Sequence, residues 1–482
     1  MDIGTSSVRA SLYDQQANPL PRASVKVETE FRSTPDGGSE IDAGDGFDKV
    51  VSAIDTLLEK TTRIKADIEC VTSCSFWHSL VGVNANGKPT TKVLGWADTR
   101  SRAQTAVLRK RFNEVRTHNR TGARFHSSYW PAKLLWFRKQ HPDVFNDTAK
   151  WLSFSDYVWS RFFGDSTTSV SMASGTGIFD IRKCDWDGEL LRFLKVDPDK
   201  LPLIVSNGTT TCRLGKTFAK RWRRLANAGW FAAIGDGAAD NIGSDCVSRD
   251  QAALMIGTSA AIRVSFAGKP PAKIPDGLWC YRVDRKRVVI GGALSDGGGL
   301  YRWLKDNLRL PSDAEAQIAK RPPGAHGLTF FPFLAGERGT GYHENAAGAI
   351  LGLRSANDSL DILQAAMESV AFRLAIIFEQ LSKLAEIKHI AASGGALRDS
   401  PIWAHMIADV IGCDLIMNST GESSSRGAVL HALQTKGKIG NINSQAVAET
   451  QVTVANKSRF NAFSEAREAH VALYKLLISR EK

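Results

Sequence analysis

The sequence predicts an α/β protein built from two duplicated domains. Its 482 residues are several times the usual length of one domain, about 100 to 200 residues. Segments with helical periodicity occur together with β-rich segments. An apolar segment that ends in Gly-Thr-Ser occurs twice, at residues 2–6 and 254–259, once near the start of each half. The apolar pattern is interrupted at residues 244–252, so we expect domains at 1–246 and 247–482.

The composition is that of a globular protein. Hydrophobic residues make up 43% and charged residues 23% of the chain, which excludes a disordered or collagen-like protein. No apolar run reaches the roughly 18 to 20 residues of a membrane span, and the N-terminus lacks the pattern of a signal peptide. We therefore expect a cytoplasmic protein with no membrane partner, whose seven cysteines are reduced thiols.

The net charge of +12 indicates anionic partners, which include nucleotides and sugar acids as well as nucleic acids. The densest basic runs lie at residues 109–111, 220–224 and 285–287. They are short and far apart, and none belongs to a recognisable nucleic-acid-binding motif. We interpret them as solvated surface and expect no nucleic-acid partner.

The N-terminal half mixes helix and strand. Apolar residues between 47 and 58 recur at helical spacing behind Asp45, which we expect to cap this helix. Residues 68–75 have the composition of a buried strand. Asn86-Gly87 lies between two apolar segments, as the turn of a hairpin does.

The C-terminal half contains two well-marked helices. Apolar residues keep a spacing of three to four from 360 to 381, which predicts a long helix before a strand at 387–392. A second helix is expected to start at Ser400-Pro401, with Ser as cap and Pro in the first position, and to stop at Gly412.

The two Gly-Thr-Ser segments are typical of a strand that turns sharply. Glycine permits the close approach of the backbone, and the exposed N–H groups and hydroxyls of such a turn can hold phosphate oxygens. The sequence has no GxxxxGK[ST] motif, and Gly235-Asp236-Gly237 does not continue as GxGxxG. The pattern thus favours duplicated domains that face a nucleotide without a P-loop or a Rossmann site.

Five segments, in this order, resemble the FGGY carbohydrate kinases over nearly the whole chain. They are DIGTSSVRASLYD (2–14), SFWHSLVGVNANG (75–87) with GWADTR (95–100), IGDGAADNIGS (234–244), LMIGTSAA (254–261), and ASGGALRDSPIWAHMIADVIG (392–412) with ESSSRGAVLHAL after it. The resemblance implies a duplicated actin-like, ribonuclease H-like ATPase fold, with two domains around a central cleft. It also implies ATP and Mg²⁺ as cofactors and transfer of a phosphoryl group to a sugar.

Within the family, four segments look most like the bacterial gluconokinase-like branch: TPDGGSEID (34–42), FWHSLVGV (76–83), TGARFHSSYWPAKLLW (121–136) and SMASGTGIFD (171–180). This implies phosphorylation of D-gluconate to 6-phosphogluconate. The alternatives are a kinase for a pentulose or polyol such as ribulose, xylulose or glycerol, a non-catalytic sugar or nucleotide sensor, and an actin-like ATPase that assembles with partners. The expected partners are ATP and a small sugar or sugar acid, and a homodimer is the candidate assembly.

The resemblance also implies roles for individual residues. Asp236 precedes Gly243 by seven positions, as the catalytic base does in the family, and Asp2 and Asp236 would hold Mg²⁺. The alternative for Asp236 is a turn carboxylate that caps a helix at 238–242. Residues that match the family's phosphate loops and nucleotide site are Gly4, Thr5, Ser6, Ser7, Arg9, Gly257, Thr258, Gly298, Arg302, Gly394, Gly395, Ala396 and Asp399. Two of these depart from glycerol kinases, which have Gln at Arg302 and Asn at Asp399.

The sugar side is expected in the segments after the first predicted strand. By resemblance, its contacts would be Trp77, His78, Trp96, Asp98, Arg100, Arg124 and His126, together with Asp236. Gluconate carries a carboxylate, for which His78, Arg124, His126 and Lys133 are candidate partners, Arg124 above all. The alternatives are a core position for the Trp77-His78 pair and an ion pair between Asp98 and Arg100 within a loop.

The N-terminal end is short by comparison with the family. Only Met1 precedes Asp2, where the resemblance implies several more residues of the first strand. We expect that the start codon was assigned too late, and that the shortened strand leaves hydrogen bonds unmade beside the active site.

Overall fold

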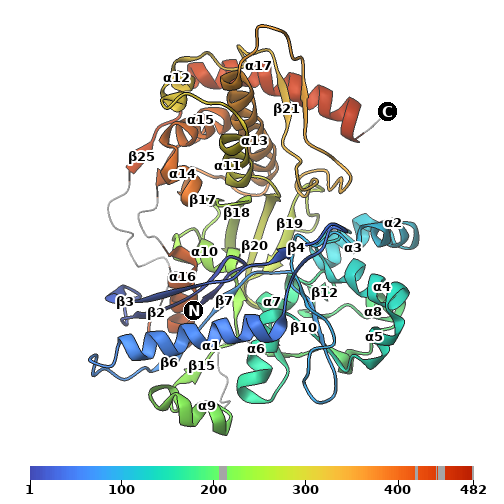
Figure 1. Ribbon diagram of the computed structural model, residues 1–482, viewed down its shortest axis with the longest axis vertical. Coiled ribbons are helices and arrows are strands. Elements are labelled where there is room, and N and C mark those ends of the chain that lie inside the picture. The colour runs from blue at the N-terminus through green and yellow to red at the C-terminus, as the bar shows by residue number, and fades with distance from the viewer. Residues whose placement is uncertain (206–213, 418–421, 441, 443–450, 480–482) are drawn as a thin grey trace.

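The computed structural model describes residues 1–205, 214–417, 422–440, 442 and 451–479. Two sheets form the centres of the two halves (Figure 1). The first has the order β16 (Ile234–Gly235), β7 (Cys74–Ser75), β1 (Asp2–Ile3), β2 (Ser7–Tyr13) and β3 (Pro19–Glu28). The second has the order β19 (Trp279–Arg282), β20 (Arg287–Leu294), β18 (Ala260–Ala267), β17 (Gln251–Ile256), β23 (His389–Ser393), β24 (Leu415–Met417) and β25 (Gln451–Thr453).

The two sheets share one topology. In the first, β1 is antiparallel to β2 and parallel to β7, which is parallel to β16. In the second, β17 is antiparallel to β18 and parallel to β23, which is parallel to β24. The Gly-Thr-Ser segments follow the equivalent strands β1 and β17. The prediction of a duplicated α/β protein is thus confirmed, and the chain passes between the sheets after Gly243, near the proposed boundary at residue 246.

Strand β1 breaks this internal symmetry because it has two residues where β17 has six. A groove of about 380 Å³ lies beyond its N-terminal end, between residues 10–15, at the end of β2, and residues 66–72, around β6 (Cys70–Val71). Most of its walls are apolar and include Leu12, Leu57, Ile68, Leu225 and Val429. The amino group of Met1 lies at the end of the groove and donates to the carbonyl oxygen of Thr72 at 2.8 Å.

Several predicted elements need correction at their ends. The first helix, α1, spans Ala43–Lys60, and its cap is Asp42 in place of Asp45, because the Asp42 carboxylate accepts from the N–H groups of Gly44 and Asp45. The predicted strand 68–75 is divided into β6 (Cys70–Val71) and β7. Asn86-Gly87 does lie in a tight turn, where Gly87 donates to the carbonyl oxygen of Asn84 at 2.9 Å.

The helices predicted in the C-terminal half are confirmed. Helix α13 spans Ser359–Ser382, and α15 spans Pro401–Ile411 with Ser400 as cap and Gly412 in the left-handed conformation after it. Strand β23 begins two residues later than expected.

The remaining helices and strands follow in chain order. In the first half they are β4 (Arg32–Ser33), β5 (Ser39–Ile41), β8 (Val81–Val83), β9 (Val93–Leu94), α2 (Arg102–Arg111), α3 (Glu114–Thr121), α4 (Trp130–Gln140), α5 (Pro142–Asp147), β10 (Lys150–Leu152), α6 (Phe154–Phe163), β11 (Thr167–Ser169), α7 (Val170–Ser174), β12 (Phe179–Asp180), β13 (Asp185–Trp186), α8 (Gly188–Leu194), β14 (Leu203–Val205), α9 (Lys216–Arg221), β15 (Gly229–Trp230) and α10 (Asp236–Gly243). In the second half they are α11 (Gly298–Asn307), α12 (Ala314–Lys320), β21 (Thr329–Phe331), β22 (Ala349–Leu351), α14 (Gly395–Asp399), α16 (Ser423–Thr435) and α17 (Lys457–Tyr474).

Helices α10 and α16 join the two halves. They follow the equivalent strands β16 and β24, and they cross with their backbones in contact (Figure 1). A Cβ atom at Gly243 would lie 1.8 Å from the carbonyl oxygen of Ser423, and one at Gly427 would lie 1.8 Å from that of Ala239. Only glycine fits these two positions, so the crossing sets how the two domains are placed.

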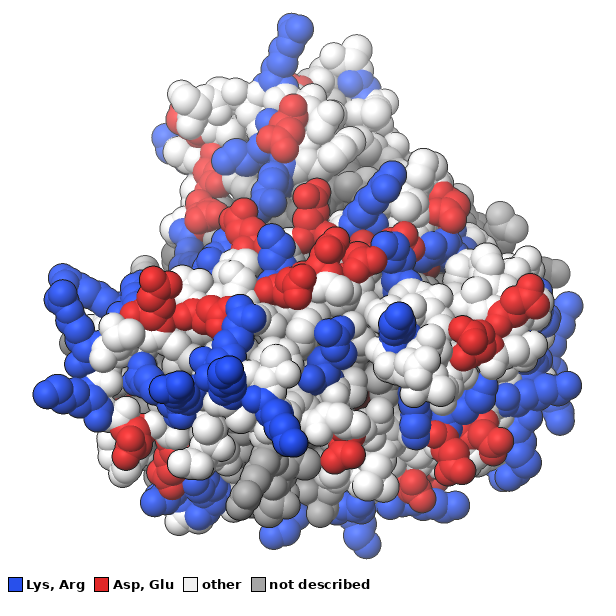
Figure 2. All heavy atoms as spheres, turned by 60° about the horizontal axis from the view of Figure 1, so that its bottom comes forward, with Lys and Arg blue, Asp and Glu red and all other residues white. Residues whose placement is uncertain are grey.

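Charged side chains of both signs alternate over the face in Figure 2. The basic run 220–224, which we expected to be solvated, is partly packed. Trp222 lies in the core, Arg221 forms an ion pair with Asp55, and Arg224 donates to the carbonyl oxygen of Thr61 at 3.1 Å. Among the helices that the structure describes, none is long and apolar enough to cross a membrane.

Candidate active site

Two carboxylates, Asp2 and Asp236, lie on or directly after central strands of the first sheet. Asp2 and Cys74 are paired in register on β1 and β7, and Cys74 is paired with Ile234 on β16, two residues before Asp236. The Cys74 thiol donates to Asp2 Oδ1 at 3.4 Å. Neighbouring strands are about 4.8 Å apart, so Asp2 and Asp236 lie across one intervening strand.

Asp236 is the first residue of α10 and not its cap, which is Gly235. Its Oδ1 accepts from the N–H group of Gly237 at 2.7 Å. The pKa of Asp236 is raised to about 6, because burial and, to a smaller extent, the charge of Asp2 raise it more than the guanidinium of Arg263 lowers it. A carboxylate with this pKa is charged at neutral pH and basic enough to take a proton.

The pKa of Asp2 is also raised, mainly by burial and against the effect of Arg9. Arg9 lies on the neighbouring strand β2, where it is paired with Asp2, and its Nη1 lies 3.7 Å from Asp2 Oδ2. Among the described residues, no three His, Cys, Asp or Glu side chains form a metal site by themselves. Two acidic oxygen donors close together still suit a Mg²⁺ ion that takes its other ligands from phosphates and water.

The first Gly-Thr-Ser segment forms the turn between β1 and β2, as predicted. The Gly4 N–H donates to the carbonyl oxygen of Ser7 at 2.9 Å. Thr29 holds the turn from outside, because its hydroxyl donates to the carbonyl oxygen of Thr5 at 3.1 Å and its N–H to that of Ser6 at 3.1 Å. Thr5 and Ser6 thus stay at the surface of a short, fixed turn.

The second Gly-Thr-Ser segment meets the start of α11. Gly298 donates to the carbonyl oxygen of Gly257 at 2.9 Å, and Gly297 and Gly299 both donate to that of Thr258 at 3.0 Å. A Cβ atom at Gly298 would lie 2.5 Å from the Gly257 oxygen and 2.7 Å from the Ala396 methyl group. The structure therefore brings together Gly257, Thr258, Gly298 and Ala396, which are distant in the sequence.

The other predicted nucleotide residues lie around the turn from β23 into α14. Gly394 has a φ of 110° and is so close to β17 that a Cβ atom would lie 2.2 Å from the carbonyl oxygen of Ile256. Gly395 has open space at its Cβ position. Arg302 on α11 and Asp399 at the end of α14 are exposed.

Trp77 lies directly beneath the Asp236 turn. Its indole N–H donates to the carbonyl oxygen of Ser171 at 3.0 Å, and its ring leaves no room for a Cβ atom at Gly235, which would lie 1.8 Å from the ring. The ring also lies against Gly237, and the side chain is 6% exposed. Trp77 thus supports both residues that flank Asp236.

His78 has a positive φ of 72° and its ring is buried. Nδ1 lies 2.5 Å from the carbonyl oxygen of Gly175, so Nδ1 carries the proton and Nε2 is the acceptor. Burial keeps the pKa of His78 well below its usual value. Nε2 lies 3.4 Å from Nη2 of Arg338, in the second domain.

The sugar-side loop 95–100 is held by internal contacts. Asp98 is fully buried and accepts from the side chain of Arg100, whose Nη2 also donates to Glu40 at 2.6 Å. This is the ion pair within a loop that the sequence left open. Lys133 is fully buried, and its Nζ donates to the carbonyl oxygens of His78 and Gly95, both at 2.8 Å.

Arg124 and His126 also have protein partners. Arg124 donates to Glu114 Oε2 and to the carbonyl oxygen of Asp276, both at 3.1 Å. His126 Nδ1 accepts from the Ser128 N–H at 3.1 Å. Burial lowers the pKa of His126 to about 4, against the effect of Glu344.

The structure adds residues that the sequence did not indicate. Arg263 on β18 bonds Asp240 and Asn241 of α10, and Ser423 of α16 bonds Asp240 as well. Arg338 lies with its Cζ 5.1 Å from the centre of the Trp96 ring. No local motif could have revealed these contacts, because each joins segments from different halves of the chain.

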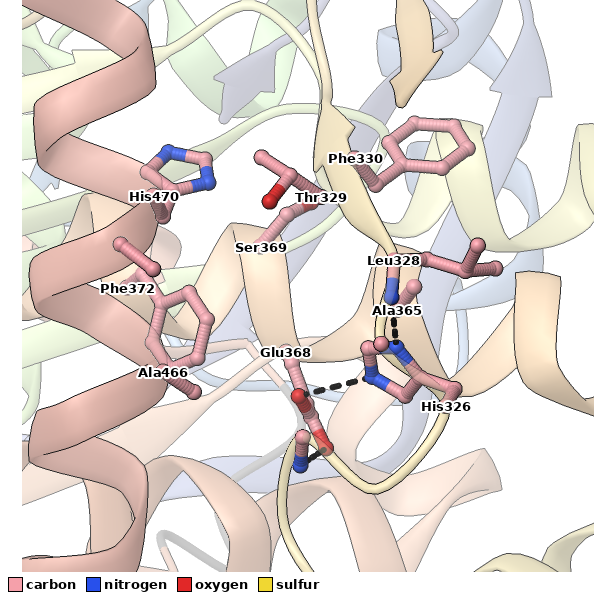
Figure 3. A pocket seen from close by; sticks show the side chains of 13 residues that line it. His326, Leu328, Thr329, Phe330, Ala365, Glu368, Ser369, Phe372, Ala466 and His470 are labelled. Atoms are coloured by element: carbon pink, nitrogen blue, oxygen red, sulfur yellow. Dashed lines mark hydrogen bonds and ion pairs between the residues drawn. The ribbon is translucent and has the colours of Figure 1, made fainter. Parts of the chain in front are cut away.

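A separate cavity of about 160 Å³ lies within the second domain (Figure 3). It is enclosed by β21, α13 and α17, and His326 bonds Glu368 on its wall at 3.1 Å. His470 points toward it from α17. None of the predicted site residues lines this cavity, so we assign it to the interior of the domain.

Comparison with known proteins agrees with this arrangement. The profile of the FGGY family of carbohydrate kinases, N-terminal domain, matches residues 1–243, and that of the C-terminal domain matches residues 252–435. The gluconokinase of Bacillus subtilis is 28% identical over 455 residues, which cover 91% of this chain and 87% of that protein.

Two solved structures from Lactobacillus acidophilus, a gluconate kinase and a ligand-bound xylulose kinase, both align with a TM-score of 0.90 and 26% identity. Each alignment covers 99% of this chain and 97% of the other. These findings confirm the predicted fold class. The chain belongs to the FGGY family of carbohydrate kinases and is an ATP-dependent sugar kinase.

Proposed function

We propose that this kinase phosphorylates a terminal hydroxyl of D-gluconate to form 6-phosphogluconate, with Asp236 as the catalytic base. The observation that carries the mechanism is the placement of Asp236, with a pKa of about 6, near Asp2, with only strand β7 between the strands that carry them. The similarity to gluconokinases supports the substrate. Xylulose kinases are similar as well, so the sugar has to be tested directly.

Asp236 would accept the proton of the attacking hydroxyl as the phosphorus–oxygen bond forms. The β- and γ-phosphates of ATP would lie between the turns at Gly4–Ser7 and Gly257–Thr258, whose N–H groups and hydroxyls suit anionic oxygens. Arg9 adds a positive charge beside the first turn. The adenosine would lie against Gly298, Gly394, Gly395 and Ala396, with Arg302 and Asp399 at its exposed edge.

Asp2 and Asp236 fit a Mg²⁺ ion in charge and in ligand type. Burial raises the pKa values of both carboxyls, and their charges repel, so a divalent cation would relieve an unfavourable arrangement. When bound, Mg²⁺ neutralises phosphate charge during transfer. Cys74 donates to Asp2 and thereby fixes the orientation of that carboxylate.

On the sugar side, Trp96, His78 and His126 would contact the substrate. Trp77, Asp98 and Arg100 would act mainly by holding these contacts in place, since their side chains are bonded within the protein. Because the phosphoryl donor is ATP, we place the enzyme in the cytoplasm. A homodimer stays a prediction, which the mass in solution tests.

Asp236→Asn tests the chemistry. The variant keeps the size of the side chain and should bind ATP without Mg²⁺ with an unchanged Kd, while kcat falls by about a hundred- to ten-thousandfold, as expected when a base is removed. Substantial turnover by Asp236→Asn would remove this residue as the base.

A substrate panel monitored by ADP release tests the sugar. It should include gluconate, xylulose, ribulose and glycerol, each over a range of concentrations. We expect the highest kcat/KM for gluconate; a preference for a neutral ketose would replace gluconate with that sugar and leave the kinase mechanism intact.

A further inference from the structure

Arg338 is a cation that the second domain presents to the sugar-side segments of the first. It follows β21, and its side chain is half-buried. The guanidinium carbon lies 5.1 Å from the centre of the Trp96 ring, and Nη2 lies 3.4 Å from His78 Nε2. Both of these partners belong to segments that the sequence assigned to sugar binding.

The loop that carries Arg338 is fixed on both sides. The Gly339 N–H donates to the carbonyl oxygen of Ala293 at 2.8 Å, and the Ala335 N–H donates to Asp296 at 3.1 Å. The neighbouring carboxylate, Glu337, accepts from Arg373 and from Tyr474. The loop therefore positions Arg338 firmly, while its adjacent acid is engaged elsewhere.

The charge of Arg338 has no counter-ion in the described part of the chain, where it forms no ion pair within 4.0 Å. By contrast, Arg100, Arg124 and Arg263 each have a carboxylate partner. The groups whose pKa values respond to the charge of Arg338 include no carboxylate; they are His78, His126, Tyr129, Lys133, Tyr281 and Tyr342. Burial keeps both histidines neutral, so they do not compete for an anion.

A half-buried guanidinium without a carboxylate is suited to an anionic ligand. Its planar N–H groups match the two oxygens of a carboxylate, and such paired, charge-assisted bonds are among the stronger ones in proteins. Stacking on Trp96 orients the guanidinium, while its other partners, His78 and the Tyr129 hydroxyl, bring no negative charge.

We infer that Arg338 binds the carboxylate of an aldonic acid substrate and selects it over neutral ketoses and polyols. This inference rests on the proposed gluconate kinase function and replaces Arg124, which Glu114 engages, as the carboxylate clamp.

The position of Arg338 relative to the base supports this role. Trp77 packs against both residues that flank Asp236, and the next residue, His78, contacts Arg338. A substrate that spans the Trp77-His78 segment would have its carboxylate at one end and the reacting hydroxyl at the other, as gluconate does. Because Arg338 and His78 belong to different domains, binding would also hold the domains together.

The test compares gluconate with its alditol, which has a hydroxymethyl group in place of the carboxylate. Titration calorimetry gives the Kd of each compound for the wild type, Arg338→Gln, Arg338→Lys and, as a matched control, the exposed Arg354→Gln. We expect Arg338→Gln to weaken gluconate binding about a hundredfold, as for loss of a charge-assisted pair, and to change alditol binding less than threefold. Arg338→Lys should recover part of the loss, and Arg354→Gln should match the wild type.

Kinetics complete the test. Arg338→Gln should raise the KM for gluconate by a similar factor and change kcat less than threefold, since the clamp lies away from the transferred group. Equal weakening for gluconate and the alditol would overturn the inference and leave the proposed function standing, as would unchanged gluconate binding. A wild type that phosphorylates xylulose and not gluconate would instead overturn the proposed substrate, and the clamp with it.

Discussion

Gly427→Ala perturbs the helix crossing that joins the two domains. An ideal Cβ atom at this position would lie 1.8 Å from the carbonyl oxygen of Ala239 and 2.8 Å from the backbone nitrogen of Gly243. Carbon and oxygen atoms in contact are usually about 3.3 Å apart, so α10 and α16 would have to separate by roughly 1.5 Å. Overpacking of this kind costs about 1 to 3 kcal/mol. The upper end applies here because the opposing atoms belong to the backbone and cannot rotate away.

A cost of about 3 kcal/mol lowers Tm by about 6 to 12 °C for a domain of roughly 200 residues. Activity should fall too, since Asp236 is the first residue of α10 and a displacement of about 1 Å in a catalytic group can cost a hundredfold in rate. We therefore expect a kcat lower by about two orders of magnitude.

Differential scanning calorimetry and steady-state kinetics on the purified variant measure both effects. Gly440→Ala is the matched control, because its Cβ would meet nothing within 4 Å, and it should leave Tm and kcat unchanged. If the Tm of Gly427→Ala lies within 1 °C of the wild-type value and kcat is unchanged, α10 and α16 do not make this close contact.

Two further predictions concern Asp236 and the N-terminal end of β1. The activity should depend on pH through Asp236, because a base must be deprotonated and the pKa of this carboxyl is about 6. We expect kcat to be constant above pH 7 and to fall by nearly tenfold per pH unit below pH 6. A kcat that stays constant down to pH 5 would contradict this. A short extension with alternating valines before Met1 should enter the apolar groove of about 380 Å³ as further residues of β1. Burial of two such side chains contributes about 3 to 6 kcal/mol, so Tm should rise by several degrees above that of a Gly-Ser extension of equal length; equal Tm values would show that the groove does not accept a strand.

Much of the fold could be predicted because local patterns determine it. Ser400-Pro401 and Gly412 mark the ends of α15 by their own backbone preferences. The two Gly-Thr-Ser segments indicated the duplication, because a sharp turn after a buried strand has strict local requirements. The error at α1 has a local cause as well: Asp42 and Asp45 are both capping residues, and only the course of the chain decides which one accepts the free N–H groups.

The sugar side was harder to predict because its residues act through distant partners. Arg124 looked like a free cation, but Glu114 and the backbone of Asp276 engage it. Lys133 binds two backbone carbonyls. The sequence around Arg338 gives no sign of its surroundings, because the residues that it contacts, His78 and Trp96, belong to the other domain.

The sequence by itself determined the family, the duplicated fold and the two Gly-Thr-Ser turns, because each depends on residue types at short spacing. The tertiary structure decided which charges remain available to a ligand. Coulomb interactions and desolvation depend on separation in space, so only the folded chain could give Asp236 its raised pKa, engage Arg124 with Glu114, and leave Arg338 without a counter-ion beside His78.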